Sequence, residues 1–385
     1  MNFTILLNLV VSFMLAYFAI PSVVRVSNTK HLFDVPDHRK LNKVVVPTLG
    51  GIAIFIGFTL STLIFTEGRA DFNYRYLFAA LIMMFFIGIK DDIMVLSAKR
   101  KLIVQILATL LLVLPGGYQL TDFYGVFGIH QVPQWLGVSV SFLFILFIMN
   151  AINLMDGIDG LAAGVSIVIA FTLGGWFYFT GHPDYGTACF ALMGALLAFL
   201  RFNLWGGHNK VFMGDTGSLL LGTFLSAMAI KFILLNQTVT GDFHITYAPV
   251  FIIGLFIVPI TDTTRVFFIR ISEKRSPFSP DMNHLHHLLI KSGLSHVQAS
   301  SFLIAYTVLF GLLALSIQKY LPISLAFVLL PAASFLCVGA IIRYKKRIDV
   351  RREKDNAESS SKTIKIQFGP VKTDTPTAET KKIHK

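Results

Sequence analysis

Long apolar segments alternate with short polar loops along most of this 385-residue chain. A membrane-spanning helix needs about 20 predominantly apolar residues. By that criterion the sequence predicts about eleven spans, and the count is good to about one because residues 102–114 form the shortest run. The expected spans are residues 3–26, 47–65, 76–89, 102–114, 135–152, 161–179, 185–202, 217–235, 247–269, 298–317 and 323–342. We therefore expect an all-α, polytopic integral membrane protein.

Composition supports this class. The chain is 54% hydrophobic and 14% charged and contains 36 Phe, which is more apolar surface than a soluble core hides. Cys189 and Cys337 lie inside apolar segments and are expected to act as small hydrophobic residues. The formal net charge of +12 would suit a nucleic-acid binder. Its basic residues lie in inter-span loops and the tail, as expected beside an anionic inner leaflet, so we expect no nucleic-acid partner.

The same basic residues predict the orientation. Loops after even-numbered spans hold only Arg69, Arg75 and Lys319. Cytoplasmic loops carry an excess of Lys and Arg, so the richly basic loops after odd-numbered spans are expected inside. The amino terminus is then outside and the carboxyl terminus cytoplasmic. Residues 1–344 are expected to form the membrane-embedded domain and residues 345–385 a flexible cytoplasmic tail.

Polar clusters follow the same alternation. Each one comes after an odd-numbered span: residues 34–48, 91–92, 153–159, 203–218 and 262–287. All five are therefore expected at the cytoplasmic face, as one active site. A transport pathway would instead leave charges through the depth of the bilayer.

The stretch NAINLMDGIDGLAAG at residues 150–164 is expected to be central to this site. Asn153, Asp156 and Asp159 recur at three-residue spacing, which on a helix directs their side chains roughly the same way. Carboxylates beside a bilayer are costly unless a cation, a partner or water receives them. The alternative is a short hydrophilic hairpin that only reverses the chain.

Asp91 and Asp92 end the third apolar run. Adjacent carboxylates at a helix carboxyl terminus oppose the helix dipole and repel each other. Lys99, Arg100 and Lys101 follow closely, and a divalent ion or phosphate-bound cation would also compensate. The alternative is a solvated helix end balanced by these basic residues.

Asp215, in VFMGDTGS, precedes the eighth run, where Asp215 or Thr216 could serve as an ordinary helix cap. Together with Asn153, Asp215 also offers hard oxygen ligands, which suit Mg²⁺ or Mn²⁺ rather than zinc. Magnesium binds through one or two protein oxygens plus substrate phosphates, so a sparse ligand set is expected.

His284, His286 and His287 fall in a loop whose Pro277 and Pro280 interrupt any helix. These histidines could bind zinc, titrate in solvent, or donate hydrogen bonds to phosphate or sugar oxygens. The sequence contains neither a Walker A loop nor a dinucleotide-binding glycine motif. Phosphate binding therefore falls to a metal ion and basic side chains.

Five motifs in this order resemble the polyprenyl-phosphate N-acetylhexosamine-1-phosphate transferases of glycosyltransferase family 4. They are VPTLGG, KDD, NAINLMDGIDGLAAG, VFMGDTGS and SPFSPDMNHLHHL, between residues 46 and 288. The likeness is greatest to the bacterial undecaprenyl-phosphate N-acetylglucosamine-1-phosphate transferases that begin O-antigen or teichoic-acid synthesis. The peptidoglycan relative, a phospho-MurNAc-pentapeptide transferase, has three consecutive histidines, whereas Leu285 interrupts the run here.

The resemblance implies that undecaprenyl phosphate attacks a UDP-N-acetylhexosamine, most simply UDP-GlcNAc, to give the lipid-diphosphate-sugar and UMP. This is a first membrane step of cell-envelope glycan synthesis at the bacterial inner membrane. Asp91 and Asp92 would be catalytic, and Asn153 and Asp215 would hold Mg²⁺ on the diphosphate. The remaining carried-over residues would contact substrate: Lys101 at the carrier phosphate, Asp159 at the nucleotide, and His284, His286, His287, Asp156, Thr48 and Arg265.

Several alternatives stay open at this point. The preferred hexosamine, the carrier length and the choice between a covalent aspartyl adduct and direct attack are not determined by the sequence. The oligomeric state is also undetermined, with a homodimer among the possibilities. An intramembrane prenyltransferase would share magnesium and isoprenoid diphosphates but release no nucleotide. A secondary transporter would show related halves, and we detect no internal repeat.

Overall fold

The computed structural model describes residues 3–34, 46–66, 72–276 and 283–368. The chain divides into two units, residues 1–337 and 338–385. The helices are α1 (Phe3–Lys30), α2 (Gly50–Phe65), α3 (Phe72–Met94), α4 (Ala98–Val113), α5 (Gln134–Met155), α6 (Leu161–Phe179), α7 (Pro183–Trp205), α8 (Gly214–Asn236), α9 (Ala248–Leu255), α10 (Ile257–Ser272), α11 (Leu285–Lys291), α12 (His296–Ile317) and α13 (Ile323–Phe368). The all-α prediction is confirmed.

Two short antiparallel pairs and two single turns of 3₁₀ helix complete the described chain. The strands are β1 (Phe33–Asp34) with β2 (Val46–Pro47), and β3 (Asp122–Val126) with β4 (Ile129–Gln131). The 3₁₀ turns are η1 (Gly207–Asn209) and η2 (Gly241–Phe243). Helix α13 continues to Phe368, into the segment expected to be a flexible tail. The domain boundary at residue 344 and the flexibility of the tail stay predictions.

Many of the helices have the length and composition of membrane spans. In the described residues seven helices pass both criteria, or eight if α9 and α10 count as one broken span. Each of the eleven predicted runs does form helix, but α2 and α4 are only 16 residues long. Large apolar side chains such as Phe18 and Phe171 point outward, exposed by 69% and 59%. The chain is thus a helical membrane protein, and the count of eleven spans stays a prediction.

The predicted span at residues 247–269 is broken. Helices α9 and α10 meet at Phe256 with a bend of 74°. Pro259 lies in the first turn of α10. In a continuous helix it would have no N–H to donate to the carbonyl of Leu255, and its ring would clash with that carbonyl, so a break at this point is expected. The bend directs α10 toward the segment that carries the histidines.

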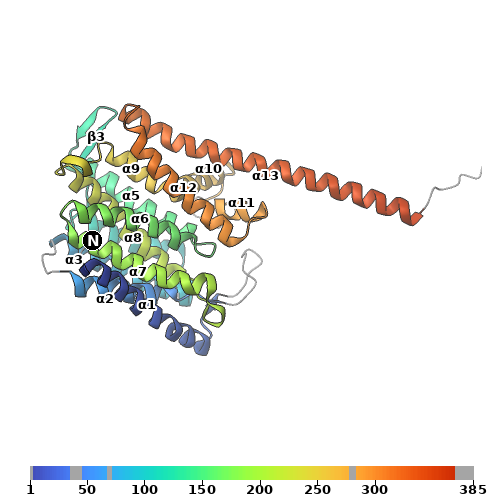
Figure 1. The fold of residues 1–385 in the computed structure, drawn as a ribbon, viewed down its shortest axis with the longest axis horizontal. Coiled ribbons are helices and arrows are strands. Elements are labelled where there is room, and N and C mark those ends of the chain that lie inside the picture. Colours follow the sequence, from blue (N-terminus) through green and yellow to red (C-terminus); the bar gives the residue numbers. More distant parts are fainter. Residues whose placement is uncertain (1–2, 35–45, 67–71, 277–282, 369–385) are drawn as a thin grey trace, which may run out of the picture. The chain divides into compact units, whose positions relative to one another are not determined.

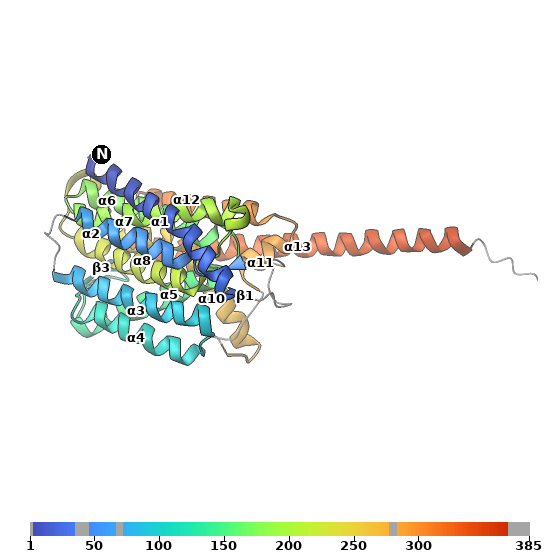
Figure 2. The same cartoon turned by 90° about the horizontal axis from the view of Figure 1, so that it is seen from below.

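Helix α8 is the most enclosed of the candidate spans, with 89% of its apolar window buried. It packs against α2, α3, α5, α6 and α9. In both ribbon views the β3–β4 hairpin and the start of α1 lie at one end of the bundle, and α11 lies at the other (Figures 1 and 2). The carboxyl ends of α3 and α5 and the amino end of α8 point toward the α11 end, so the polar residues that follow α3 and α5 and begin α8 gather at one end of the bundle. Residues 35–45 and 277–282, parts of two further predicted clusters, lie outside the described residues.

Glycines let the backbones of α2 and α3 approach the start of α8. A Cβ atom on Gly51 would lie 2.2 Å from the nitrogen of Gly217, and one on Gly88 would lie 2.4 Å from the Cα of Thr216. The amide of Gly51 also donates to the carbonyl of Met213 at 2.9 Å. These contacts fix the first turn of α8 between two neighbouring helices.

We expect Gly88→Ala to lower the thermal unfolding midpoint of the detergent-solubilised protein, because its methyl group would meet α8 backbone; overpacking of this kind costs about 1–3 kcal/mol. Gly175→Ala in α6 is the matched control, since a Cβ there meets no atom within 4 Å. A wild-type midpoint for Gly88→Ala would contradict this packing.

Candidate active site

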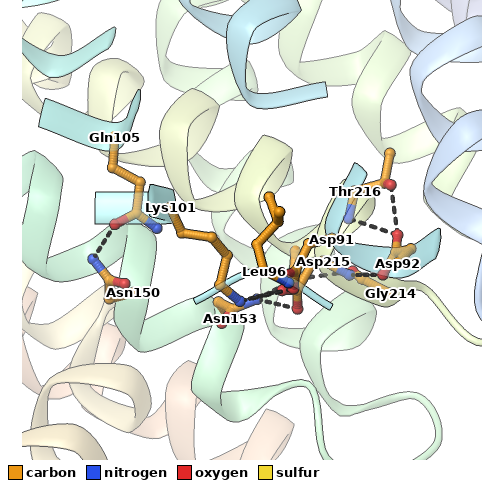
Figure 3. A network of polar contacts seen from close by, with 11 residues as sticks. Asp91, Asp92, Leu96, Lys101, Gln105, Asn150, Asn153, Gly214, Asp215 and Thr216 are labelled. Atoms are coloured by element: carbon orange, nitrogen blue, oxygen red, sulfur yellow. Dashed lines mark hydrogen bonds and ion pairs between the residues drawn. The ribbon is translucent and has the colours of Figure 1, made fainter. Parts of the chain in front are cut away.

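A lysine joins the carboxylates of two helices at the centre of the site. The ammonium of Lys101, on α4, lies 2.9 Å from Asp91 Oδ2 of α3 and 2.5 Å from Asp215 Oδ2 of α8 (Figure 3). The tight turn between α3 and α4 makes this possible, because the amide of Leu96 donates to Asp91 Oδ1 and brings α4 back beside α3. The positive charge offsets the repulsion between two carboxylates that are otherwise close together.

Asp92 caps the start of α8 from another helix. Its Oδ1 accepts the amide of Asp215 at 2.7 Å, and its Oδ2 accepts the amide and the hydroxyl of Thr216 at 3.0 and 2.5 Å (Figure 3). The first amides of a helix have no intrahelical partner, and a carboxylate there also complements the helix dipole. The cap that the sequence led us to expect from Asp215 or Thr216 is therefore supplied by Asp92.

Gly214 makes room for this capping arrangement. Its φ is +71°, and a Cβ there would lie 2.2 Å from the carbonyl oxygen of Thr48 and 2.6 Å from Asp92 Oδ2. Thr48 was predicted to contact substrate. In the structure its backbone carbonyl lies beside Gly214, at the start of α8.

Asn153, at the end of α5, completes the first cluster. Its Nδ2 donates to Asp215 Oδ1 and to Ser218 Oγ, both at 2.8 Å. One helical turn earlier, Asn150 donates to the buried Gln105 of α4 at 3.1 Å (Figure 3). The structure therefore brings together the residues predicted to be catalytic or metal-binding, which are Asp91, Asp92, Asn153 and Asp215. Lys101, predicted to lie near the carrier phosphate, joins them.

Asp159 belongs to a separate group. Helix α5 ends at Met155, so the three-residue spacing does not align Asp159 with Asn153. Instead Asp159 Oδ2 accepts from Lys210 at 2.7 Å, with His296 at 3.7 Å. Its Oδ1 is buried without a hydrogen-bond partner among the described residues.

Two neighbouring elements hold the Asp159 turn in place. Ser300 of α12 donates to the carbonyl of Asp159 at 2.6 Å, and the Asn203 side chain accepts the amide of Gly160 at 2.8 Å. Helix α12 begins with a capping box formed by Ser295 and Gln298, which sets its first turn beside Asp159.

The histidine segment is a short helix rather than a loop. His284 is the residue before α11, while His286 and His287 lie within it. Pro277 and Pro280, which suggested a loop, lie outside the described residues. His284 and His286 are 4% and 2% exposed, so these two side chains are buried rather than surrounded by solvent.

His286 packs directly on the Asp156–Asp159 turn. A Cβ on Gly157 would lie 2.2 Å from Nε2 of His286, and neither ring nitrogen of His286 has a hydrogen-bond partner among the described residues. Burial, together with the neighbouring histidines, lowers the pKa of His286 to about 3. His286 is therefore neutral at physiological pH.

Sequence reasoning assigned no role to Asp262 and placed Arg265 at the substrate. In the structure Asp262, on α10, accepts hydrogen bonds from the ring of His284 at 2.9 Å and the amide of Leu285 at 2.8 Å. Arg265 contacts Asp262 and the carbonyl of Asn283. The only sequence signal for Asp262 was an acidic residue inside an apolar run. Lys210, the partner of Asp159, gave no signal beyond its charge.

No group of three His, Cys, Asp or Glu side chains arranged for a metal ion occurs among the described residues. The donors that are present are nonetheless the oxygens that Mg²⁺ accepts: Asp215, Asp91 and the amide of Asn153. The two carboxylates already converge on one cation, Lys101. This sparse, oxygen-only set fits an ion that takes its remaining ligands from substrate phosphates.

Asp156 lies between the cluster that contains Asp92 and Asp215 and the group that contains Asp159. Burial raises its pKa to about 8, and the carboxylates of Asp215, Asp92 and Asp159 add to the shift. A carboxylic acid held this way retains its proton near neutral pH unless a cation comes close.

These features describe a helical membrane protein with a polar cluster among its helix ends, and sequence comparison identifies its family. The glycosyl transferase family 4 model matches residues 74–233. With relatives at 30% identity aligned over most of their length, the chain belongs to glycosyl transferase family 4.

Three of the relatives are named for the same activity. The undecaprenyl-phosphate alpha-N-acetylglucosaminyl 1-phosphate transferase of Escherichia coli K12 is 30% identical over 355 residues, covering 88% of this chain and 93% of the relative. The same enzyme of Salmonella typhimurium is 30% identical over 347 residues, covering 86% and 91%. A probable undecaprenyl-phosphate N-acetylglucosaminyl 1-phosphate transferase of Bacillus subtilis is 32% identical over 336 residues, covering 85% and 89%.

The raised pKa of Asp156 predicts a pH-dependent stability. Between its ordinary value of 3.8 and about 8, the folded protein retains a proton that the unfolded chain releases, so the folded state loses stability as pH rises. Asp156→Asn removes this penalty, and in metal-chelated buffer its thermal unfolding midpoint should exceed that of wild type by a margin that widens from about pH 5 to pH 8. The exposed Asp242→Asn is the control. A margin that does not change with pH would contradict the assignment.

Proposed function

We propose that this protein transfers N-acetylglucosamine-1-phosphate from UDP-N-acetylglucosamine to undecaprenyl phosphate, giving undecaprenyl-diphosphate-N-acetylglucosamine and UMP. The observation that carries the proposal is the cluster of Asp91, Lys101, Asn153 and Asp215 at one end of an apolar helix bundle. Relatives that align along most of the chain bear the name of this activity.

The chemistry requires two anions to meet. The carrier phosphate must approach the diphosphate of the sugar nucleotide, and charge develops on the departing UMP. A Mg²⁺ ion, or Mn²⁺, would neutralise the diphosphate when bound. Asp215 and Asn153 would hold it with Asp91 beside them, and Lys101 would pair with the carrier phosphate.

The two adjacent aspartates take different roles in this proposal. Both oxygens of Asp92 accept hydrogen bonds from the start of α8, so Asp92 positions Asp215. Asp91 faces Lys101, where the carrier phosphate would bind, and its side chain is 11% exposed. We favour direct attack by the carrier phosphate, with Asp91 orienting it or accepting its proton.

The proposal includes an orientation in the membrane. The α11 end of the bundle faces the cytoplasm of a bacterial cell, the amino terminus lies outside, and the chain crosses the inner membrane about eleven times. The distribution of basic loops supports this orientation. The polar contacts among α4, α5 and α8 lie at the α11 end, opposite the β3–β4 hairpin, where a soluble nucleotide would reach them (Figure 2). A site there meets a soluble nucleotide while the carrier tail stays in the bilayer.

We expect the purified protein to release UMP from UDP-N-acetylglucosamine only when undecaprenyl phosphate and Mg²⁺ are both present, because the site needs the carrier as nucleophile and a cation on the diphosphate. Coupled detection of UMP measures this, and chelation by EDTA should abolish it. UDP-N-acetylgalactosamine and UDP-N-acetylmuramoyl-pentapeptide, supplied separately, test the sugar. UMP release from one of these two nucleotides but not from UDP-N-acetylglucosamine would overturn the choice of N-acetylglucosamine. No UMP release from any of the three would overturn the reaction.

The separate roles of the aspartates are also testable. Asp91→Asn should lower turnover by about 100-fold or more, the range expected for a group that assists proton transfer or orients the nucleophile. Asp92→Asn should lower turnover too, and should reduce the thermal unfolding midpoint more than Asp91→Asn does, since charged caps contribute about 1–3 kcal/mol. Asp242→Asn again serves as control. If Asp91→Asn turned over at the wild-type rate, Asp91 would not be catalytic.

A further inference from the structure

Asp262 and His284 form a buried pair beside the proposed active site. Asp262 lies on α10 and is 3% exposed, and His284, just before α11, is 4% exposed. Nδ1 of His284 lies 2.9 Å from Asp262 Oδ2. Asp262 Oδ1 accepts the next amide, that of Leu285, at 2.8 Å. One carboxylate therefore holds both the ring of His284 and the backbone beside it.

This contact selects a tautomer. Two acceptors cannot share a hydrogen bond, so beside the Asp262 carboxylate Nδ1 must carry the proton. Arg265 also contacts Asp262 Oδ1, at 3.4 Å, and favours its charged form. Nε2 of His284 is then the ring nitrogen left to meet another group.

The position of His284 connects it to the reaction centre. Its ring stacks on that of His286, with 5.7 Å between centroids and 8° between planes. His286 in turn packs on Gly157, between Asp156 and Asp159. The titratable groups that face His284 are Asp262 of α10 and His286 of α11. Arg265 acts on Asp262, and His287 and His296 act on His286. Only His286 therefore lies between the Asp262–His284 pair and the Asp156–Asp159 turn.

We propose that Asp262 is a positioning residue that holds His284 as its Nδ1–H tautomer and so presents Nε2 to the diphosphate or sugar of the bound nucleotide. The assignment of that ligand rests on the proposed function, but the tautomer does not. In this arrangement Asp262 acts on turnover only through His284. Arg265 contacts the Asp262 carboxylate and the Asn283 carbonyl, so it supports the pair.

The tautomer is tested first, without substrate. Nitrogen NMR of protein labelled with ¹⁵N-histidine distinguishes a protonated ring nitrogen from a bare one, and the His284 signals are assigned by their loss in His284→Ala. We expect wild-type His284 in its neutral form to carry its proton on Nδ1. Asp262→Asn, whose amide can donate as well as accept, should shift His284 toward the Nε2–H tautomer. A wild-type ring protonated on Nε2 alone would overturn the proposal.

Kinetics then tests the consequence by a double-mutant cycle. Asp262→Asn should lower kcat by about 10- to 100-fold, as is typical when a group that orients a histidine is lost, and leave KM for UDP-N-acetylglucosamine within about threefold. In the His284→Ala background the same substitution should change kcat by less than about twofold. Equal losses in both backgrounds would show that Asp262 acts independently of His284 and would overturn the proposal.

A structural control lies one residue away. Thr261 shares a buried hydrogen bond of 2.8 Å with Ser334, so Thr261→Val weakens the same helix without touching His284. It should leave the His284 tautomer unchanged and show no kinetic coupling to His284→Ala. If Thr261→Val coupled to His284→Ala as strongly as Asp262→Asn does, the Asp262 effect would be explained by the stability of α10 alone. That result would contradict the proposal. If wild-type protein released no UMP, the proposed function would fail while the NMR result still decided the tautomer.

Discussion

The hydrogen bonds that Asp92 accepts from the first turn of α8 hold the site together. Helix α8 is surrounded by five other helices, and its amino end carries Asp215, which meets Lys101 and Asn153. Because the free amides of that end are satisfied by a carboxylate from α3, the relative position of α3 and α8 is set by charge-assisted bonds rather than by apolar contact alone. Gly88 and Gly214 permit the close approach that these bonds require.

Much of the site was predictable because it rests on residue type and order. Asp91, Asp92, Asn153 and Asp215 were each singled out from polar residues at the ends of apolar runs, and the structure places them in one cluster. Lys101 was assigned through the family resemblance, because Lys99 and Arg100 beside it carry the same charge and the residue pattern does not distinguish the three. The turn in which the Leu96 amide donates to Asp91 brings α4 back beside α3, and in this arrangement Lys101 contacts Asp91.

What the sequence did not predict depends on where helices stop and bend. The helical spacing that was expected to align Asp159 with Asn153 fails because α5 ends at Met155. Asp159 instead forms an ion pair with Lys210, which is distant in sequence. Asp262 was overlooked because a single carboxylate within an apolar run has no local signature. Its role appears only when the bend at Phe256 brings α10 under the histidine helix. Tertiary contacts of this kind leave no spacing pattern.

The charge balance of the site favours a cation that arrives with substrate. In the described part of the site, Lys101 forms ion pairs with Asp91 and Asp215, and Lys210 forms an ion pair with Asp159. Asp156 lies between the groups, and its pKa of about 8 reflects burial close to carboxylates whose lysine partners are already engaged. A sugar nucleotide would add further negative charge at the same place. Binding it without a divalent ion would then require the enzyme to protonate its own carboxylates, whereas a magnesium-nucleotide complex brings compensating charge to the oxygens of Asp215 and Asn153. We therefore propose that the ion would assist nucleotide binding as well as the later displacement of UMP.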